Sequence, residues 1–259
     1  MILRDMTIAD IPAGLRLCRA CGWNQLESDW RIFLEQSPKG CRVAEQNGQV
    51  VGTVATLRFQ NRFAWISMML VDPNARGQGI GKRLFGEALE VLRDIPCIRL
   101  DATSAGRELY KNFGFLDEYT IYRTKMNITE KPQPGTTRRM TATDLPEVLA
   151  KDREIFGADR AFLLKRLFQE APEYAWIVPG LGYSFGRRGA NCGQLGPIVA
   201  EDESTARQLL EAHADGSFYI DTPHQPATYE RSFIRMHRGE KQFSERVDRQ
   251  YAITGPEFG

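Results

Sequence analysis

Hydrophobic positions in the first half of the chain follow two spacings. Alternating or continuous apolar runs predict strands at residues 2–4, 41–45, 49–57, 63–71, 98–101 and 118–125. Apolar residues three and four apart predict two helices before Pro38, a third that ends near Arg93 and a short fourth at 105–112. This order of strands and helices predicts a mixed α/β (α+β) domain.

One loop interrupts the pattern between the strand at 63–71 and the helix that follows. It carries glycines at alternate positions, Gly77, Gly79 and Gly81. Glycine lets backbone N–H groups approach a ligand closely, and N–H groups at a helix start bind anions with help from the helix dipole. Positive charge is added by Arg76, Lys82 and Arg83. The loop therefore predicts a phosphate or pyrophosphate site.

The spacing of these glycines limits the choice of ligand. A dinucleotide fingerprint needs a third glycine where this chain has Leu84, and no Gly-Lys-Ser/Thr of a P-loop is present. The stretch instead resembles the acyl-CoA loop of the GCN5-related N-acetyltransferase (GNAT) superfamily. That pattern is Gln/Arg-x-x-Gly-x-Gly/Ala after a strand ending in Val-x-Pro. It is met here by Arg76, Gly79 and Gly81, with Val71 and Pro73 upstream.

A second segment supports the resemblance. Residues 106–115 resemble the Leu-Tyr-x-x-x-Gly-Phe segment of the family, with Tyr110 at the tyrosine position. The resemblance makes Tyr110 the general acid that protonates the departing thiolate. The family often has Asn seven places earlier, and this chain has Thr103 there.

The resemblance implies acetyl-CoA as cosubstrate and direct transfer of the acetyl group to a primary amine. Backbone groups of the strand before the loop would pair with pantetheine and polarise the thioester carbonyl, and the loop would hold the pyrophosphate. The CoA-binding residues that it assigns are Met69, Leu70, Val71, Arg76, Gly77, Gln78, Gly79, Ile80, Gly81, Lys82 and Thr103.

The general base is not identified by the sequence. Many relatives use a glutamate on the strand before the loop, but residues 63–69 contain no carboxylate. Asp72, Glu27 and Asp29 are candidates, as is a chain of water molecules, and a solvated helix surface is the alternative interpretation of Asp29. The resemblance places Trp23, Asn24, Asp29 and Trp65 near the acceptor, with core packing as the alternative for the indoles.

The second half repeats the start of the first. Residues 139–149 match residues 5–15 at one offset, with Met, Thr, Asp, Pro and Leu in common. Its loop reads Glu201-Asp202-Glu203 and has no glycine, so a pyrophosphate there would meet like charge. We predict a CoA-binding GNAT domain at 1–130, a linker at 131–135, and a shortened, degenerate GNAT-like domain at 136–259 that binds no CoA and shapes the acceptor site.

Composition excludes several function classes. The chain has 259 residues, 42% hydrophobic residues and a net charge of +1, without the basic field that nucleic acid or a membrane surface attracts. No apolar run approaches the roughly 18 residues of a membrane span, and the N-terminal residues do not form a signal peptide. The five cysteines include a Cys18-x-x-Cys21 pair but no zinc set, so we expect free thiols, no metal and a cytoplasmic location.

The sequence thus predicts tandem GNAT-like domains, each a mixed, mostly antiparallel sheet flanked by helices. The predicted activity is an acetyl-CoA-dependent N-acetyltransferase that acts on a small-molecule amine. Two alternatives remain open at this point, a non-catalytic acyl-CoA sensor and an acetyltransferase of protein N-termini or lysines. A homodimer is also left open.

Overall fold

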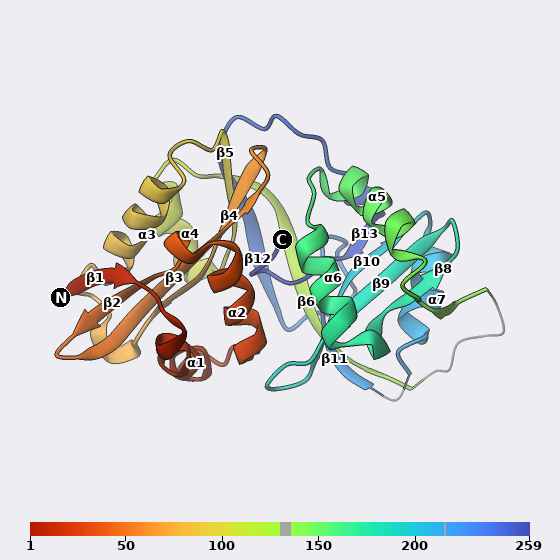
Figure 1. Cartoon of the computed structure of the whole chain (residues 1–259), viewed down its shortest axis with the longest axis horizontal. Coiled ribbons are helices and arrows are strands. Elements are labelled where there is room, and N and C mark those ends of the chain that lie inside the picture. The colour runs from red at the N-terminus through yellow and green to blue at the C-terminus, as the bar shows by residue number, and fades with distance from the viewer. Residues whose placement is uncertain (130–135, 215) are drawn as a thin grey trace.

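The chain folds as two α/β halves that share one sheet (Figure 1). The structure is a computed structural model, and it describes residues 1–129, 136–214 and 216–259. The predicted linker at 131–135 lies outside the described residues. The helices of the first half are α1 (Ile11–Ala20), α2 (Glu27–Gln36), α3 (Ile80–Val91) and α4 (Ser104–Lys111). Its strands are β1 (Ile2–Asp5), β2 (Arg42–Gln46), β3 (Gln49–Phe59), β4 (Phe63–Val71), β5 (Cys97–Ala102) and β6 (Leu116–Ile128).

The second half has fewer helices. They are α5 (Leu145–Phe156), α6 (Ala161–Glu170) and α7 (Glu203–Glu211). The strands are β7 (Arg138–Arg139), β8 (Trp176–Val178), β9 (Gly182–Arg187), β10 (Gly193–Ala200), β11 (Gly216–Thr222), β12 (Arg231–Gly239) and β13 (Gln250–Ala252). Within the described residues no helix lies between β11 and β12, where the first half has α4 between β5 and β6. The second half is therefore shortened between β11 and β12.

The two halves exchange a strand at the centre of the sheet. The strand order is β1-β2-β3-β4-β5-β12-β6-β11-β10-β9-β8-β7. Strand β12, from the second half, lies between β5 and β6 of the first half and is antiparallel to both. Strand β6 in turn pairs with β11. Figure 1 shows β6 and β12 side by side between the two halves. Residues from both halves therefore face the region between β4 and β6.

Apolar packing joins the halves on one face of the sheet. The core under α1 and α2 is continuous with the core under α5 and α6, and it includes Trp30, Phe33 and Phe156. Phe258, near the C-terminal end, stacks on Phe33 with ring centroids 5.1 Å apart. The segment 250–259 is thus packed as a strand, β13, followed by an arm. Helix α3 packs on the opposite face of the first half, where Leu84 is fully buried.

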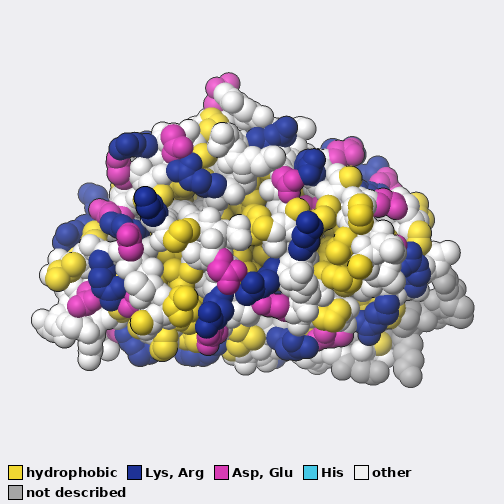
Figure 2. Space-filling model, viewed as in Figure 1, with side chains coloured by type: hydrophobic (Ala, Val, Ile, Leu, Met, Phe, Trp, Pro, Cys, Tyr) yellow, Lys and Arg dark blue, Asp and Glu magenta, His cyan; other side chains and the backbone are white. Residues whose placement is uncertain are grey.

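The surface carries both signs of charge. On the face shown in Figure 2, basic and acidic side chains are interspersed. Among the described residues, the helices are too short or too polar to cross a bilayer.

Candidate active site

Strands β4 and β5 separate to form a wedge. They pair in parallel only at Ala64 with Ile98 and at Trp65 with Arg99. A bulge in β4 at Met68, which has φ of 52°, shifts the register with β3 beyond this point. The edge of β4 past Trp65 therefore presents backbone N–H and C=O groups that an extended ligand can pair with.

The glycine loop stands at one end of this wedge. Gly77 and Gly79 have φ of 78° and 73°, a backbone conformation that favours glycine. Gly79 is the N-cap of α3 and contributes no side-chain hydrogen bond, so the first N–H groups of the helix remain open. Arg76, Gln78 and Lys82 are exposed beside these N–H groups. The residues fit a diphosphate, because N–H donors, a helix dipole and cations converge on one exposed loop.

A pocket continues the wedge toward the second half. It holds about 630 Å³ of empty space, with its mouth included. Residues from five places line it: the loop before α2, the separated parts of β4 and β5, α4 with its N-cap, the exchanged strands β6 and β12, and the C-terminal arm. They are Trp23, Asn24, Gln25, Ile66, Ser67, Met68, Met69, Leu100, Asp101, Thr103, Tyr110, Arg123, Arg231, Phe233, Pro256 and Glu257. Neither half alone builds this pocket.

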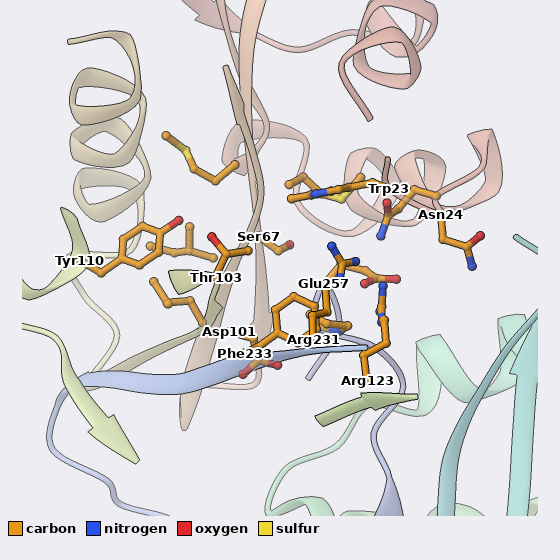
Figure 3. Close-up of a pocket in the computed structure, with 16 residues that line it drawn as sticks. Trp23, Asn24, Ser67, Asp101, Thr103, Tyr110, Arg123, Arg231, Phe233 and Glu257 are labelled. Atoms are coloured by element: carbon orange, nitrogen blue, oxygen red, sulfur yellow. The ribbon is translucent and has the colours of Figure 1, made fainter. Parts of the chain in front are cut away.

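Tyr110 lies on one side of the pocket, next to Thr103 (Figure 3). Its ring packs on Phe85 with centroids 4.8 Å apart, and part of it faces the pocket. Burial raises the pKa of the Tyr110 phenol to about 12, so the hydroxyl carries its proton at neutral pH. The Thr103 oxygen accepts a hydrogen bond of 3.3 Å from the N–H of Gly106 and caps α4, and its own O–H remains a donor.

The structure brings some predicted acceptor residues to the pocket. Trp23 and Asn24 line it. The Asn24 amide is already engaged, because it donates to Cys192 O at 3.0 Å and accepts from Asn191 N at 2.8 Å. Asn24 therefore links the loop before α2 to the second half through hydrogen bonds. The neighbouring Trp23 ring lines the pocket.

The other two predicted residues lie elsewhere. Trp65 is fully buried under the guanidinium groups of Arg99 and Arg235, and its indole N–H donates to Pro256 O at 2.9 Å. Asp29 is only 1% exposed, which excludes the solvated surface, and it accepts from Leu26 N at 2.6 Å. Neither residue lines the pocket. The C-terminal arm covers the Trp65 ring, and Asp29 contacts Arg187 instead.

Asp29 belongs to a buried charge cluster that reaches the pocket. Arg187 of β9 lies 3.2 Å from the Asp29 carboxylate and also forms an ion pair with Glu257. Two carboxylates therefore contact one guanidinium. Burial raises the pKa of Asp29 and lowers the pKa of Arg187. Of the two carboxylates only Glu257 lines the pocket, where it can accept a hydrogen bond from an amine.

The remaining charged groups come from the centre of the sheet. Asp101 of β5 accepts both bonds of a bidentate pair with Arg235, each 2.9 Å long. Arg123 of β6 forms a similar pair with Asp221, at 2.7 and 2.6 Å. Arg231 of β12 lies opposite Arg123 in the sheet register. Sequence reasoning missed Glu257, Arg123 and Arg231, since only the exchanged strands and the arm bring them together.

The equivalent wedge of the second half is filled. Strands β10 and β11 pair in parallel from Gly193 to Leu195 and then separate, as β4 and β5 do. Strand β13 occupies the gap: it pairs with β10 at Ile198, and Ile253 N donates to Asp221 O of β11 at 2.8 Å. In the second wedge β13 therefore pairs with backbone groups of β10 and β11. Among the described residues, the equivalent groups of the first wedge have no such strand beside them.

Comparison with known proteins agrees with this architecture. The family model described as "Acetyltransferase (GNAT) family" matches residues 14–115, and the one described as "Acetyltransferase (GNAT) domain" matches residues 148–252. A Pyrococcus horikoshii protein of known crystal structure is 27% identical, with a TM-score of 0.84 over 100% of this chain and 95% of that chain.

Two curated proteins are similar over much of the chain. The holothin acyltransferase of Pseudoalteromonas sp. (strain SANK 73390) is 27% identical over 193 residues, which are 73% of this chain and 65% of that protein. The match thus spans slightly less than two thirds of the holothin acyltransferase. The uncharacterised N-acetyltransferase YitH of Bacillus subtilis (strain 168) is 26% identical over 235 residues, which are 86% of this chain and 82% of YitH.

Fold, wedge and matches define a GNAT acetyltransferase, and the chain belongs to that family. Within it the protein has two GNAT domains, since both halves match. The sequence-based prediction of tandem GNAT-like domains is confirmed.

Proposed function

We propose that this protein is an acetyl-CoA-dependent N-acetyltransferase that transfers the acetyl group directly to the primary amine of a small molecule. The observation that carries the proposal is the continuous path in the first half from the glycine loop, along the open edge of β4, to the pocket at Tyr110. The second half lacks such a path because β13 fills its wedge.

The CoA diphosphate would lie on the N–H groups of residues 76–82, and pantetheine along the edge of β4 at Met69, Leu70 and Val71. Pantetheine carries two amides, so a separated strand edge is a complementary surface for it. A backbone N–H at the bulge would polarise the thioester carbonyl. In this arrangement the sulfur comes to the side of the pocket where Tyr110 lies.

The transfer itself needs two proton movements. The neutral amine attacks the carbonyl carbon, the C–S bond breaks, and the thiolate takes a proton from the Tyr110 hydroxyl. We assign the amine proton to Glu257, whose carboxylate lines the pocket on the side opposite Tyr110 (Figure 3). Arg187 holds that carboxylate in place through their ion pair, and a carboxylate in this position can accept the proton of the amine.

Enclosure of the pocket favours a small acceptor over a protein N-terminus or lysine. Its acceptor side is built by Arg123, Arg231, Phe233 and Glu257, which β6, β12 and the C-terminal arm place across from the loop that carries Trp23. A polypeptide needs an open groove along which to lie, and these four residues close the far side.

The test is release of free CoA thiol from acetyl-CoA with a panel of small amines. We expect turnover by the wild type. In Tyr110→Phe the kcat should fall by about 100-fold or more, which is the usual contribution of a general acid, and the affinity for acetyl-CoA should not change. Tyr229→Phe, at an exposed tyrosine outside the pocket, is the matched control. Acetyl-CoA binding without turnover of any amine would instead identify a sensor.

A further inference from the structure

Two arginines lie directly opposite each other on neighbouring strands. Arg231 of β12 is in register with Arg123 of β6, and both line the pocket. Like charges placed opposite each other across antiparallel strands destabilise a sheet. Nearby anions reduce this destabilisation, because each anion neutralises one of the two guanidinium groups.

Arg123 has its own anion. Its Nε and Nη2 donate to the two carboxylate oxygens of Asp221 at 2.7 and 2.6 Å. Asp221 is fully buried and also accepts a bond of 2.9 Å from Gln194. In this bidentate pair the Asp221 carboxylate neutralises the charge of the Arg123 guanidinium.

Arg231 has no such anion. Within residues 1–129, 136–214 and 216–259, the ion pairs at the pocket join Arg123 to Asp221, Arg187 to Glu257 and Arg235 to Asp101, and none includes Arg231. Its guanidinium carbon lies 5.0 Å from the ring centroid of Phe233.

Its surroundings disfavour a bare positive charge. Burial and the charge of Arg123 lower the pKa of Arg231. A guanidinium nevertheless keeps its proton in proteins. The pocket therefore holds a half-buried cation that a ligand anion would neutralise.

The position of Arg231 in the pocket indicates which ligand carries the anion. In Figure 3, Tyr110 lies on one side of Ser67 and Thr103, and Arg231 lies on the other side together with Glu257 and Trp23. Under the proposed function the CoA sulfur approaches Tyr110, so the far side receives the amine. There the pocket offers the Glu257 carboxylate and the Arg231 guanidinium, which complement an ammonium and a carboxylate on one small molecule.

We propose that Arg231 binds a carboxylate of the acceptor, so that the acceptor class is small amines that carry a carboxylate, as amino acids do. A guanidinium presents paired N–H donors whose geometry fits a carboxylate. The inference rests on the proposed function, because that function defines which side of the pocket holds the acceptor. The other source of the same chemistry is a dicarboxylic acyl group on CoA, which the experiment distinguishes.

The experiment compares amines in matched pairs with acetyl-CoA as donor: an amino acid against the amine that lacks its carboxylate, such as phenylalanine with phenethylamine and leucine with isoamylamine. We expect the wild type to favour the carboxylate-bearing member by about tenfold or more in kcat/KM, the usual worth of a charge-assisted hydrogen bond. Arg231→Met should abolish the preference and leave acetyl-CoA affinity unchanged. Arg231→Lys should retain part of it, and Arg238→Met, at an exposed arginine of the same strand, should retain all of it.

An equal preference in wild type and Arg231→Met would overturn the inference. A second arm uses succinyl-CoA with the carboxylate-free amines. If Arg231→Met lowers only that reaction, the anion belongs to the acyl donor and the assignment to the acceptor is wrong.

A binding arm separates this inference from the proposed function. Calorimetry measures amino-acid binding in the presence of CoA. Binding that depends on Arg231 without any transfer would refute the proposed function and support the carboxylate site. Transfer to simple amines without any dependence on Arg231 would do the reverse, and absence of both transfer and binding would overturn both.

Discussion

The two halves begin alike and end differently. In the first half Arg4 and Thr7 bind the carboxylate of Asp10, with both Arg4 bonds 2.8 Å long. In the second half Arg138 and Thr141 bind Asp144 in the same way, at 2.8 and 2.7 Å. These matching contacts give the sequence repeat a structural counterpart.

The difference lies at the two wedges. The first wedge is open and leads to a loop of glycines and cations, whereas the second is closed by β13 and followed by Glu201, Asp202 and Glu203. The chain that closes the second wedge then continues to Pro256 and Glu257, which line the pocket of the first. The second half thus supplies side chains to the pocket beside the open wedge of the first half.

The largest effect is expected where the arm meets the pocket. Glu257→Gln keeps the shape of the side chain but cannot accept the amine proton, so kcat should fall about 100-fold. The affinity for acetyl-CoA should not change, because Glu257 lies on the acceptor side. Glu201→Gln, at a partly exposed carboxylate of the second half, is the control and should keep full activity. Steady-state kinetics with a good amine substrate measures both, and an unchanged kcat in Glu257→Gln would rule out its role as base.

The next effect concerns the backbone at the start of α3. Gly79→Val puts a β-branched residue at φ of 73° and displaces the N–H groups of the loop. We expect CoA affinity to fall by about tenfold or more, since relief of such strain is worth roughly 1–3 kcal/mol. Gly180→Val is the matched control, because Gly180 has φ of 72° in a turn of the second half. If both substitutions weaken CoA binding equally, the effect is loss of stability and not of the anion site.

A smaller effect is expected at the corresponding helix of the second half. Asp202 caps α7, and its carboxylate accepts from Thr205 N at 2.8 Å. Asp202→Ala should lower the free energy of unfolding by about 1 kcal/mol, the typical worth of such a cap. It should leave CoA affinity unchanged, as measured by urea unfolding and by calorimetry. A gain in CoA affinity would indicate that this loop can bind an anion and that only the negative charge of Asp202 prevents binding in the wild type.

The smallest effect tests the shared motif by pH. The hydrogen bonds from Arg4 lower the pKa of Asp10 to about 2, and those from Arg138 lower the pKa of Asp144 further. A carboxyl with a lowered folded-state pKa stabilises the fold above its unfolded pKa of about 4 and loses this contribution as the pH falls. Unfolding free energy should therefore drop between about pH 4 and pH 2 more steeply in the wild type than in Asp10→Asn or Asp144→Asn. Equal slopes would show that neither carboxyl is coupled to folding.

The sequence predicts what local pattern determines. The glycines at 77–81, Tyr110 and the repeat at 139–149 are visible because a loop, a helix segment and a strand-to-helix start each depend on neighbouring residues. The tandem GNAT fold follows from these segments, and the family matches confirm it.

The rest depends on contacts between residues far apart in the chain. Arg123 and Arg231 meet because β12 inserts between β5 and β6. The spacing of hydrophobic residues along the chain does not predict this exchange of strands. Glu257 reaches the pocket because Phe258 packs on Phe33 and Pro256 accepts from Trp65. The same arm covers Trp65, which therefore does not line the pocket. Local reasoning predicted a site at the glycine loop and the end of β4, whereas the residues that β6, β12 and the C-terminal arm add to the pocket required the assembled sheet.

The central claim is that the glycine loop of the first half binds the diphosphate of CoA and that the second half binds none. Isothermal titration calorimetry of the wild type and of Gly79→Val with CoA tests it most directly. We predict one CoA per chain in the wild type, weakened in Gly79→Val by about tenfold or more. Two CoA molecules per chain, or one whose affinity Gly79→Val leaves intact, would contradict the account.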